Sequence, residues 1–264
     1  RVLDLCDLDS HKWERFASAS RWPMSAVYAS EARRLAAYEA KATGEFDATV
    51  LISEAERDDL ARLAGDKKIH VIANGVDLDA LDPGPEPPPG DGLSCVFVGA
   101  MDYLANVDSV VYFHDEVLPK VREQVPDARF RIVGANPAPE VVKLAETPGV
   151  TVTGRVAEVR PEILECAVSV APIRLGRGVP NKVLEALALT LPVVTTSCGV
   201  AGLDSSGLEG VAVADDAAGF AAAVVGLLRA DRSRYPGNRE VLRERYSWEP
   251  HMRRLCDLVL EGVG

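Results

Sequence analysis

Short apolar segments alternate along this chain with longer segments whose apolar residues recur at helical spacing. The apolar segments predict strands near residues 2–6, 48–52, 69–73, 94–98, 130–133, 150–153, 168–171, 193–196 and 211–213. The segments between them predict helices near residues 26–42, 53–63, 107–124, 139–146, 160–166, 180–190, 217–230 and 248–261. Because strands that alternate with helices form parallel sheets covered by helices, the pattern predicts an α/β fold of the Rossmann type with helices on both faces.

A segment rich in proline and glycine divides the chain. DPGPEPPPGDG, residues 82–92, is unsuited to the interior of a helix or strand. We therefore predict a first domain at 1–81, a linker at 82–92, a second domain at 93–247 and a closing helix at 248–264. The first domain shows only three convincing strands, fewer than a parallel sheet usually has, so we expect it to be truncated.

Composition excludes several classes of protein. With 264 residues, 47% of them hydrophobic, the chain can form one large or two modest cores. Its 29 Lys and Arg against 40 Asp and Glu give a net charge of −11, which argues against a general nucleic-acid binder. Five cysteines without C-x-x-C spacing, and first residues unlike a signal peptide, predict a reduced, cytoplasmic chain. Peripheral contact with the inner face of a membrane stays open.

The segment RLGRGVPNKVLEALALTLPVVTT, residues 174–196, has the features of an anion-binding helix start. Gly176 and Gly178 lack Cβ atoms, so their loop can turn tightly and approach a ligand. Pro180 suits the first position of a helix. The backbone amides of Asn181 and the next two residues are then free to bind an anion, which predicts a phosphate site.

Charged side chains accompany this predicted phosphate site. Arg174 and Arg177 suit forked contacts with phosphate, and Lys182 adds a point charge. Glu185 follows Lys182 by three residues, so both project from nearly the same helix face. The Glu185 carboxylate could accept hydrogen bonds from two ribose hydroxyls, so the group fits a diphosphate attached to a ribose. It also fits a plain surface helix with a solvated Lys–Glu pair, and this segment alone leaves both readings open.

Several segments together resemble a known family. NGVDLDALDPG (74–84), CVFVGAMDYLANVDSVVYF (95–113), FRIVGANP (130–137), VTVTGRVAEVRP (150–161) and the segment at 174–196 look like the C-terminal half of a GT-B glycosyltransferase. The likeness is to retaining, nucleotide-sugar-dependent enzymes of the family-four (glycosyl transferases group 1) type, especially a bacterial branch associated with exopolysaccharide. DLDSHKWERFA (7–17) and residues 28–56 resemble the end of the acceptor domain in that branch.

The resemblance implies a hexosyltransferase activity and a set of site residues. The donor would be a UDP- or GDP-sugar, the acceptor a saccharide or lipid-linked saccharide, and no metal or other cofactor is expected. Catalytic roles fall on Arg177, Lys182 and Glu185, with Glu185 on the ribose and Lys182 on the phosphate. The donor-binding residues implied by the resemblance are Gly99 in the first glycine loop, Gly154 and Arg155 in the base-side loop, and Arg174, Gly178, Asn181, Lys182 and Glu185.

The chain departs from the family pattern at two places. Arg177 stands where a second glutamate, eight residues before Glu185, usually contacts the transferred sugar. Ala100 and Asn106 stand near the expected positions of an arginine and a lysine in the first glycine loop. We therefore expect the cations of residues 174–182 to supply the charge that binds the diphosphate.

Other functions fit this sequence less well or stay open beside the glycosyltransferase. The triplet at 7–9, DLD, matches a short metal motif, but Asp9 and Ser10 are better explained as caps of a following helix. An NAD-dependent oxidoreductase would need G-x-G-x-x-G after a strand, and neither VGAMDYLAN nor VGANPAPE has that spacing. A GT-B-like sugar-nucleotide epimerase and a non-catalytic nucleotide-sugar-binding fragment stay open as alternatives.

Overall fold

The computed structural model describes residues 1–65, 68–85, 90–175, 181–230 and 234–261. The chain forms two compact units, the first from residues 1–75 with 248–261 and the second from residues 76–247. The predicted boundary at residue 81 therefore lies inside the second unit. Val76 belongs there because its backbone N–H donates to Tyr246 O at 2.7 Å and its side chain packs in that unit's core.

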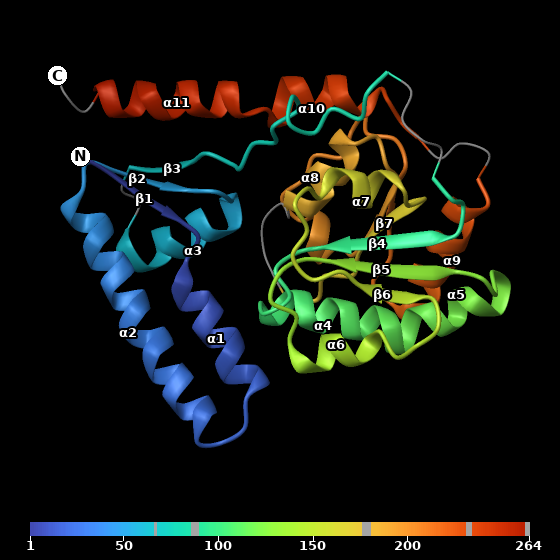
Figure 1. Cartoon of the computed structure of the whole chain (residues 1–264). Coiled ribbons are helices and arrows are strands. Elements are labelled where there is room, and N and C mark those ends of the chain that lie inside the picture. Colours follow the sequence, from blue (N-terminus) through green and yellow to red (C-terminus); the bar gives the residue numbers. More distant parts are fainter. Residues whose placement is uncertain (66–67, 86–89, 176–180, 231–233, 262–264) are drawn as a thin grey trace. The chain divides into compact units, whose positions relative to one another are not determined.

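The first unit contains a small parallel sheet. Strands β1 (Val2–Cys6), β2 (Ala48–Leu51) and β3 (Ile69–Val71) pair in the order β1-β2-β3. Helices α1 and α2 form a hairpin between β1 and β2 (Figure 1). The helices of this unit are α1 (Asp9–Ala19), α2 (Met24–Glu45), α3 (Glu54–Ala64) and α11 (Trp248–Glu261).

Side-chain hydrogen bonds at two helix starts test the predicted caps. Ser53 caps α3 as its spacing to Glu56 predicts, because its Oγ accepts from Glu56 N at 3.3 Å. The predicted capping of α1 by Asp9 and Ser10 is wrong. Both lie inside α1, and the Ser10 hydroxyl instead donates to the buried Glu39 carboxylate of α2 at 2.5 Å. A long-range partner replaces the local cap.

The second unit contains a six-stranded parallel sheet in the order β6-β5-β4-β7-β8-β9. Its strands are β4 (Ser94–Val98), β5 (Arg129–Val133), β6 (Val150–Val152), β7 (Val168–Ala171), β8 (Val193–Thr195) and β9 (Val211–Val213). This is the strand order of a doubly wound Rossmann sheet. The winding direction reverses between β4 and β7, which lie side by side at the centre.

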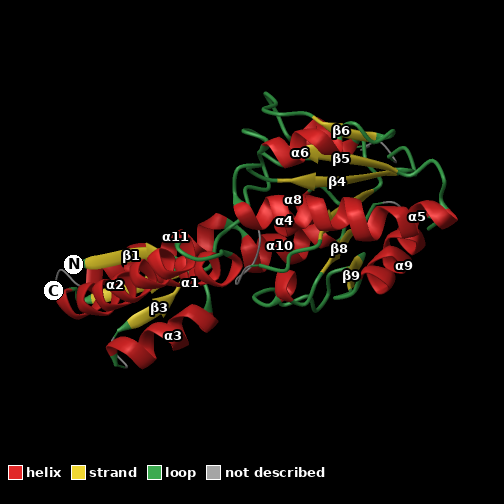
Figure 2. Cartoon of the chain, turned by 90° about the horizontal axis from the view of Figure 1, so that it is seen from below, coloured by secondary structure: helices red, strands yellow, loops and turns green. Residues whose placement is uncertain are grey.

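Helices cover both faces of the second sheet. Figure 1 shows α4 and α6 on one side of β4, β5 and β6, with α7 and α8 on the other, and Figure 2 shows the same sheet seen from below. The first core holds side chains of α4 (Leu104–Tyr112), α5 (Leu118–Gln124), α6 (Pro139–Leu144) and α9 (Ala217–Leu228). The second core holds side chains of α7 (Arg160–Leu164), α8 (Asn181–Ala188) and α10 (Asn238–Tyr246).

The alternation of β4 shows how the sheet separates these cores. Cys95 and Phe97 pack in the first core and Val96 in the second, because successive side chains of a strand point to opposite faces. The predicted α/β class with parallel sheets and helices on both faces is confirmed. The single helix predicted at 107–124 is wrong in detail. It begins at Leu104 and contains a π-helical turn at Phe113–Val117.

Candidate functional site

The carboxyl ends of β4 and β7 form the switch point of the second sheet. In open parallel sheets, ligands bind outside the carboxyl ends of the strands at such a point. The loop after β4 leads into α4, and the segment after β7 leads toward α8 on the opposite face. Side chains from these two connections therefore meet at one edge of the sheet.

Two glycines bring the backbone close together beside this point. Gly99 follows β4, and its N–H donates to Val133 O at 3.0 Å. A Cβ on Gly134 would lie 1.7 Å from Gly99 O, so no other residue fits there without backbone movement. A Cβ on Gly99 would lie 2.6 Å from the Asn106 Nδ2 atom. The predicted glycine loop is thus packed directly against the first turn of α4.

Lys182 reaches from the first turn of α8 across the switch point to α4. Its Nζ donates to Asn106 Oδ1 at 2.7 Å and lies 4.7 Å from the centroid of the Phe97 ring. Asn106 is 8% exposed, and its Nδ2 donates to Ala100 O at 2.9 Å. The ammonium therefore sits on a fixed acceptor and an aromatic face at the end of β4.

Burial shifts the pKa values of both charged groups on α8. Desolvation lowers the pKa of Lys182 to about 8, although the negative charge of Glu185 opposes the shift. Desolvation raises the pKa of Glu185, and Lys182 opposes that shift. Within the described part of the chain, the Glu185 carboxylate makes no hydrogen bond or ion pair. The site thus holds a cation and a carboxylate one helical turn apart, each partly removed from water.

Arg174, predicted to bind phosphate, is held by two other groups. Its guanidinium donates from Nε and Nη2 to the two carboxylate oxygens of Asp108, at 3.1 and 2.5 Å. It also lies 4.3 Å from the centroid of the Tyr112 ring. Asp108 and Tyr112 both belong to α4, so this contact also bridges the switch point. Any phosphate contact by Arg174 would use its remaining donors or displace Asp108.

The other residues predicted to bind the donor do not all lie at the switch point. Gly154 and Arg155 follow β6, two strands from β4, with Gly154 at a φ of 67° and Arg155 exposed. Asn181 begins α8 and is exposed. Arg177 and Gly178 lie outside the described residues. The structure therefore brings Gly99, Lys182, Glu185 and Arg174 to the switch point and places Gly154 and Arg155 farther along the sheet edge.

Some residues of the site were not found from the sequence. Phe97, Asp108 and Tyr112 each contact a predicted cation, yet they precede those cations by more than sixty residues. From the sequence, Asn106 is only a position near which the family pattern has a cation that this chain lacks. The available signal was that polar residues in the first turns of a helix after a central strand lie at the sheet's binding edge.

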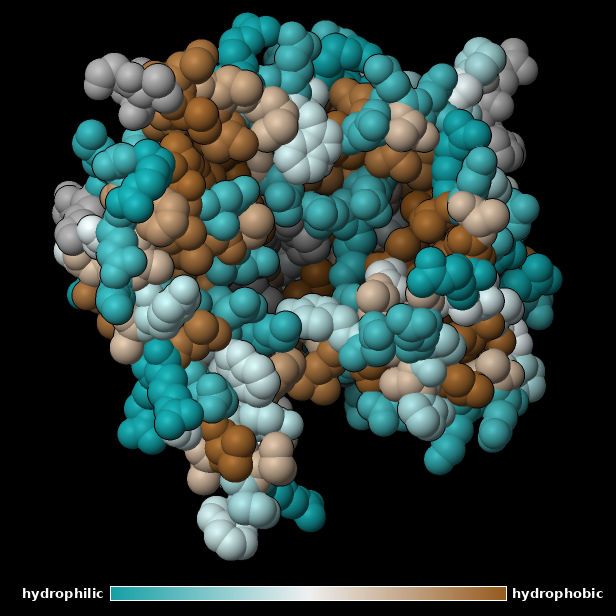
Figure 3. Space-filling model, turned by 60° about the vertical axis from the view of Figure 1, so that its left-hand side comes forward, coloured by the Kyte–Doolittle hydropathy of each residue, from teal (hydrophilic) through white to brown (hydrophobic). Residues whose placement is uncertain are grey.

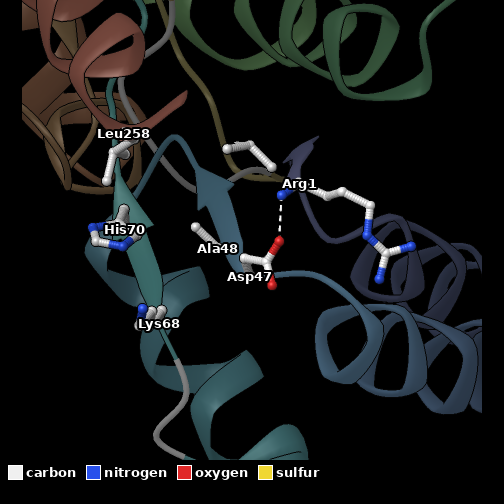
Figure 4. Close-up of a pocket in the computed structure, with 7 residues that line it drawn as sticks. Arg1, Asp47, Ala48, Lys68, His70 and Leu258 are labelled. Atoms are coloured by element: carbon white, nitrogen blue, oxygen red, sulfur yellow. Dashed lines mark hydrogen bonds and ion pairs between the residues drawn. The ribbon is translucent and has the colours of Figure 1, made fainter. Parts of the chain in front are cut away.

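The first unit has a separate small cavity of about 270 Å³ at the amino ends of its strands (Figure 4). Its lining residues are Arg1, Val2, Asp47, Ala48, Lys68, His70 and Leu258. The backbone ammonium of Arg1 pairs with Asp47 there. This edge is opposite to the carboxyl ends of the strands, where parallel sheets usually bind ligands. The cavity therefore adds nothing to the candidate site.

The acidic triplet of the first unit does not form a metal cluster. Leu8 is buried between the two aspartates, and its N–H donates to the Glu56 carboxylate at 3.2 Å. Across the described ranges, no three His, Cys, Asp or Glu side chains gather closely enough to hold a metal ion.

Among the helices that the structure describes, none is both long and apolar enough to span a membrane.

Comparison with known proteins gives matches along most of the chain. The family model described as "Glycosyl transferases group 1" matches residues 92–230, more than half of the chain, and that described as "Glycosyltransferase Family 4" matches residues 11–80. No curated protein sequence matches the chain.

Solved structures share the fold. S. aureus TarM, solved in complex with UDP, is 16% identical with a TM-score of 0.71, and the match covers 85% of this chain and 46% of TarM. Anabaena HepE, solved with UDP-glucose, is 13% identical with a TM-score of 0.70, covering 98% and 72%. Sucrose-phosphate synthase from Thermosynechococcus elongatus is 16% identical with a TM-score of 0.69, covering 98% and 67%. The chain thus spans about half the length of TarM.

At such identities these structures establish the fold class only, which is that of the GT-B glycosyltransferases. The family is shown by the family model for residues 92–230, because that match covers more than half of the chain. The matched residues include the strands and helices that form the switch point. The chain belongs to the glycosyl transferases group 1 family.

Proposed function

We propose that this chain is a glycosyltransferase. It would bind a UDP- or GDP-sugar as donor and move the hexose to a saccharide or lipid-linked saccharide. The observation that carries the proposal is the placement of two partly buried groups one helical turn apart at the switch point: the Lys182 ammonium, and the Glu185 carboxylate, which makes no hydrogen bond or ion pair with the described residues. A diphosphate fits the ammonium and the α8 backbone amides, and a ribose fits the carboxylate. TarM and HepE, which share the fold, were both solved with UDP or a UDP-sugar.

We propose that the transfer proceeds with retention and without a resident metal. The bond between the anomeric carbon and the diphosphate oxygen breaks, and negative charge develops on the β-phosphate of the leaving nucleotide. The acceptor hydroxyl oxygen bonds to that carbon on the same face, and the hydroxyl proton passes to the departing phosphate oxygen. Lys182 and the amides at the start of α8 would stabilise the charge on the β-phosphate, because fixed donors in a site of low water content need little reorganisation.

A membrane-bound acceptor, as in bacterial exopolysaccharide synthesis, would bring the chain to the inner membrane surface. The α1–α2 hairpin supports such a contact. Trp22 is 83% exposed, and Met24 and Val27 are also exposed beside Arg21. In Figure 3 this end of the hairpin lies at the bottom of the view, where pale and brown residues adjoin hydrophilic ones. Tryptophan and arginine together suit an anionic lipid surface.

Vesicle sedimentation tests this membrane contact. We expect binding to vesicles containing anionic phospholipid and weaker binding after Trp22→Ala. Leu63→Ala is the matched control, because Leu63 is also exposed but lies on α3. Equal binding by both variants would place the contact elsewhere.

A non-catalytic donor-binding role is the second candidate. Arg177 replaces the glutamate that would contact the transferred sugar, so the chain could bind the donor without turning it over. Measuring sugar release and transfer with the bound donor distinguishes the two roles.

The first test is thermal unfolding with UDP, GDP, ADP, NAD and the corresponding UDP- and GDP-sugars. A ligand at one hundred times its Kd stabilises a protein by about 2.7 kcal/mol, which corresponds to roughly 2–4 °C at this size. We expect one base and its sugars to give this shift. Lys182→Ala should remove it, whereas Lys143→Ala, on the exposed surface of α6, should not. No shift with any nucleotide would refute the proposal.

A further inference from the structure

We propose that Asn106 is a positioning residue that holds Lys182 away from Glu185 and so keeps a diphosphate-binding cation separate from a ribose-binding carboxylate. This inference deepens the proposed function and rests on it. Glu185 lies three residues after Lys182 on α8, at the spacing where Lys and Glu side chains commonly pair. Such a pair would neutralise both groups before a ligand arrived.

The contacts of Asn106 prevent that pairing. Lys182 Nζ donates to Asn106 Oδ1 at 2.7 Å, and within the described residues it makes no ion pair with Glu185. An ammonium can only donate, so the amide must present its oxygen to Lys182 and its NH2 to the Ala100 carbonyl. Both ends of the amide are therefore fixed by one consistent pair of bonds.

Packing holds this amide in place. Asn106 is 8% exposed and lies against the backbone of Gly99, where a Cβ would be 2.6 Å from its Nδ2. Phe97 lies beneath the ammonium, with its ring centroid 4.7 Å from Nζ. A lysine side chain loses rotamer freedom when it is held, so an acceptor that fixes it beforehand lowers the cost of binding phosphate. Asn106 supplies that acceptor without adding a negative charge.

The charge of the side chain at position 106 determines how well Lys182 can bind a diphosphate. An aspartate has nearly the same shape as asparagine, but its carboxylate would pair with Lys182 and repel a diphosphate. An alanine would free Lys182 to turn toward Glu185. Both changes should weaken binding of the diphosphate far more than binding of the nucleoside.

The test compares UDP, or GDP if that is the base bound, with the matching nucleoside. We expect Asn106→Ala and Lys182→Ala each to lower the preference for the diphosphate by on the order of tenfold, the usual effect of losing a hydrogen bond to a charged group. If Asn106 acts through Lys182, the double variant should lose no more than Lys182→Ala alone. Ser109→Ala is the matched control, because it removes one hydrogen bond, to Ala105 O, from the same helix.

Additive losses, or equal losses for diphosphate and nucleoside, would overturn the inference. Failure of the wild-type chain to bind any nucleotide would instead refute the proposed function. Competitive amine labelling of Lys182 at a series of pH values needs no ligand and tests the contact alone. Asn106→Asp should shift the labelling midpoint upward by one pH unit or more, and an unchanged midpoint would overturn the inference even if no nucleotide binds.

Discussion

Nucleotide affinity should fall about tenfold between pH 7 and pH 9 because Lys182 loses its proton in that interval. Burial lowers the pKa of this lysine to about 8. A diphosphate binds the protonated form, so the apparent Kd rises by the factor 1 + 10^(pH − pKa). That factor is about 1.1 at pH 7 and about 11 at pH 9. Phosphate groups, whose second pKa is near 6, keep a nearly constant charge over the same range.

The direction of this pH effect depends on which protonation state of Lys182 the diphosphate binds. The ligand-free protein has a lysine pKa below the usual value, and the bound diphosphate raises it. Binding therefore takes up a proton, about half of one per nucleotide at pH 8 and most of one at pH 9. Titration calorimetry in two buffers with different ionisation enthalpies measures this uptake directly, together with the affinity at each pH.

Two comparisons assign the effect to Lys182. Lys182→Arg stays protonated across the range, so its affinity for the diphosphate should change little between pH 7 and pH 9. The nucleoside, which lacks phosphate, should bind the wild-type chain with little pH dependence. Constant affinity of the wild type for the diphosphate, or a tenfold loss that persists in Lys182→Arg, would refute the reasoning.

Three further predictions concern other described residues. Glu185→Ala should remove the carboxylate that accepts hydrogen bonds from the ribose hydroxyls. In a binding assay the variant should bind UDP about tenfold more weakly than the wild type and should no longer prefer UDP to 2′-deoxy-UDP. Gly134→Ala puts a Cβ 1.7 Å from Gly99 O and should cost about 3 kcal/mol in urea unfolding, whereas Gly226→Ala in α9, which meets nothing within 4 Å, should be neutral or slightly stabilising. Burial raises the pKa of Glu56 in the folded chain, so the folded chain holds this proton to higher pH than the unfolded chain does. The free energy of unfolding of the wild type should therefore fall as pH rises above about 4.5. A fall of the same size in Glu56→Gln would contradict this.

The sequence predicted the strands well because each is a short apolar run bounded by turn residues. Strand bounds such as Ser94–Val98 and Val168–Ala171 coincide with the predicted ones. The order of the strands was not predicted, because alternation with helices and right-handed crossovers fit more than one doubly wound order. Helix α10 was not predicted. Its nine residues are mostly charged or polar, and it is held by a few buried groups such as Leu242.

The candidate site could be predicted only on the side of α8. Its glycines, cations and carboxylate occupy one continuous segment, so their spacing could be read directly. Its partners on α4 could not be paired with them, because Asn106 and Lys182 are 76 residues apart and nothing local links them. The same holds for Arg174, whose expected phosphate contact competes with a bidentate bond to Asp108. Which cation is available thus depends on the other half of the switch point.

The two bridges across the switch point have different consequences for a bound anion. Asp108 brings a full negative charge to Arg174, so that pair is close to neutral and chiefly ties the segment after β7 to α4. Asn106 brings only an amide dipole to Lys182, so the ammonium keeps its charge while its position is fixed. In a chain with a net charge of −11, an anion is attracted only where a cation stays uncompensated. If the proposed donor binds here, we therefore expect Lys182 rather than Arg174 to meet its diphosphate, because of the residues on α4 that contact each cation.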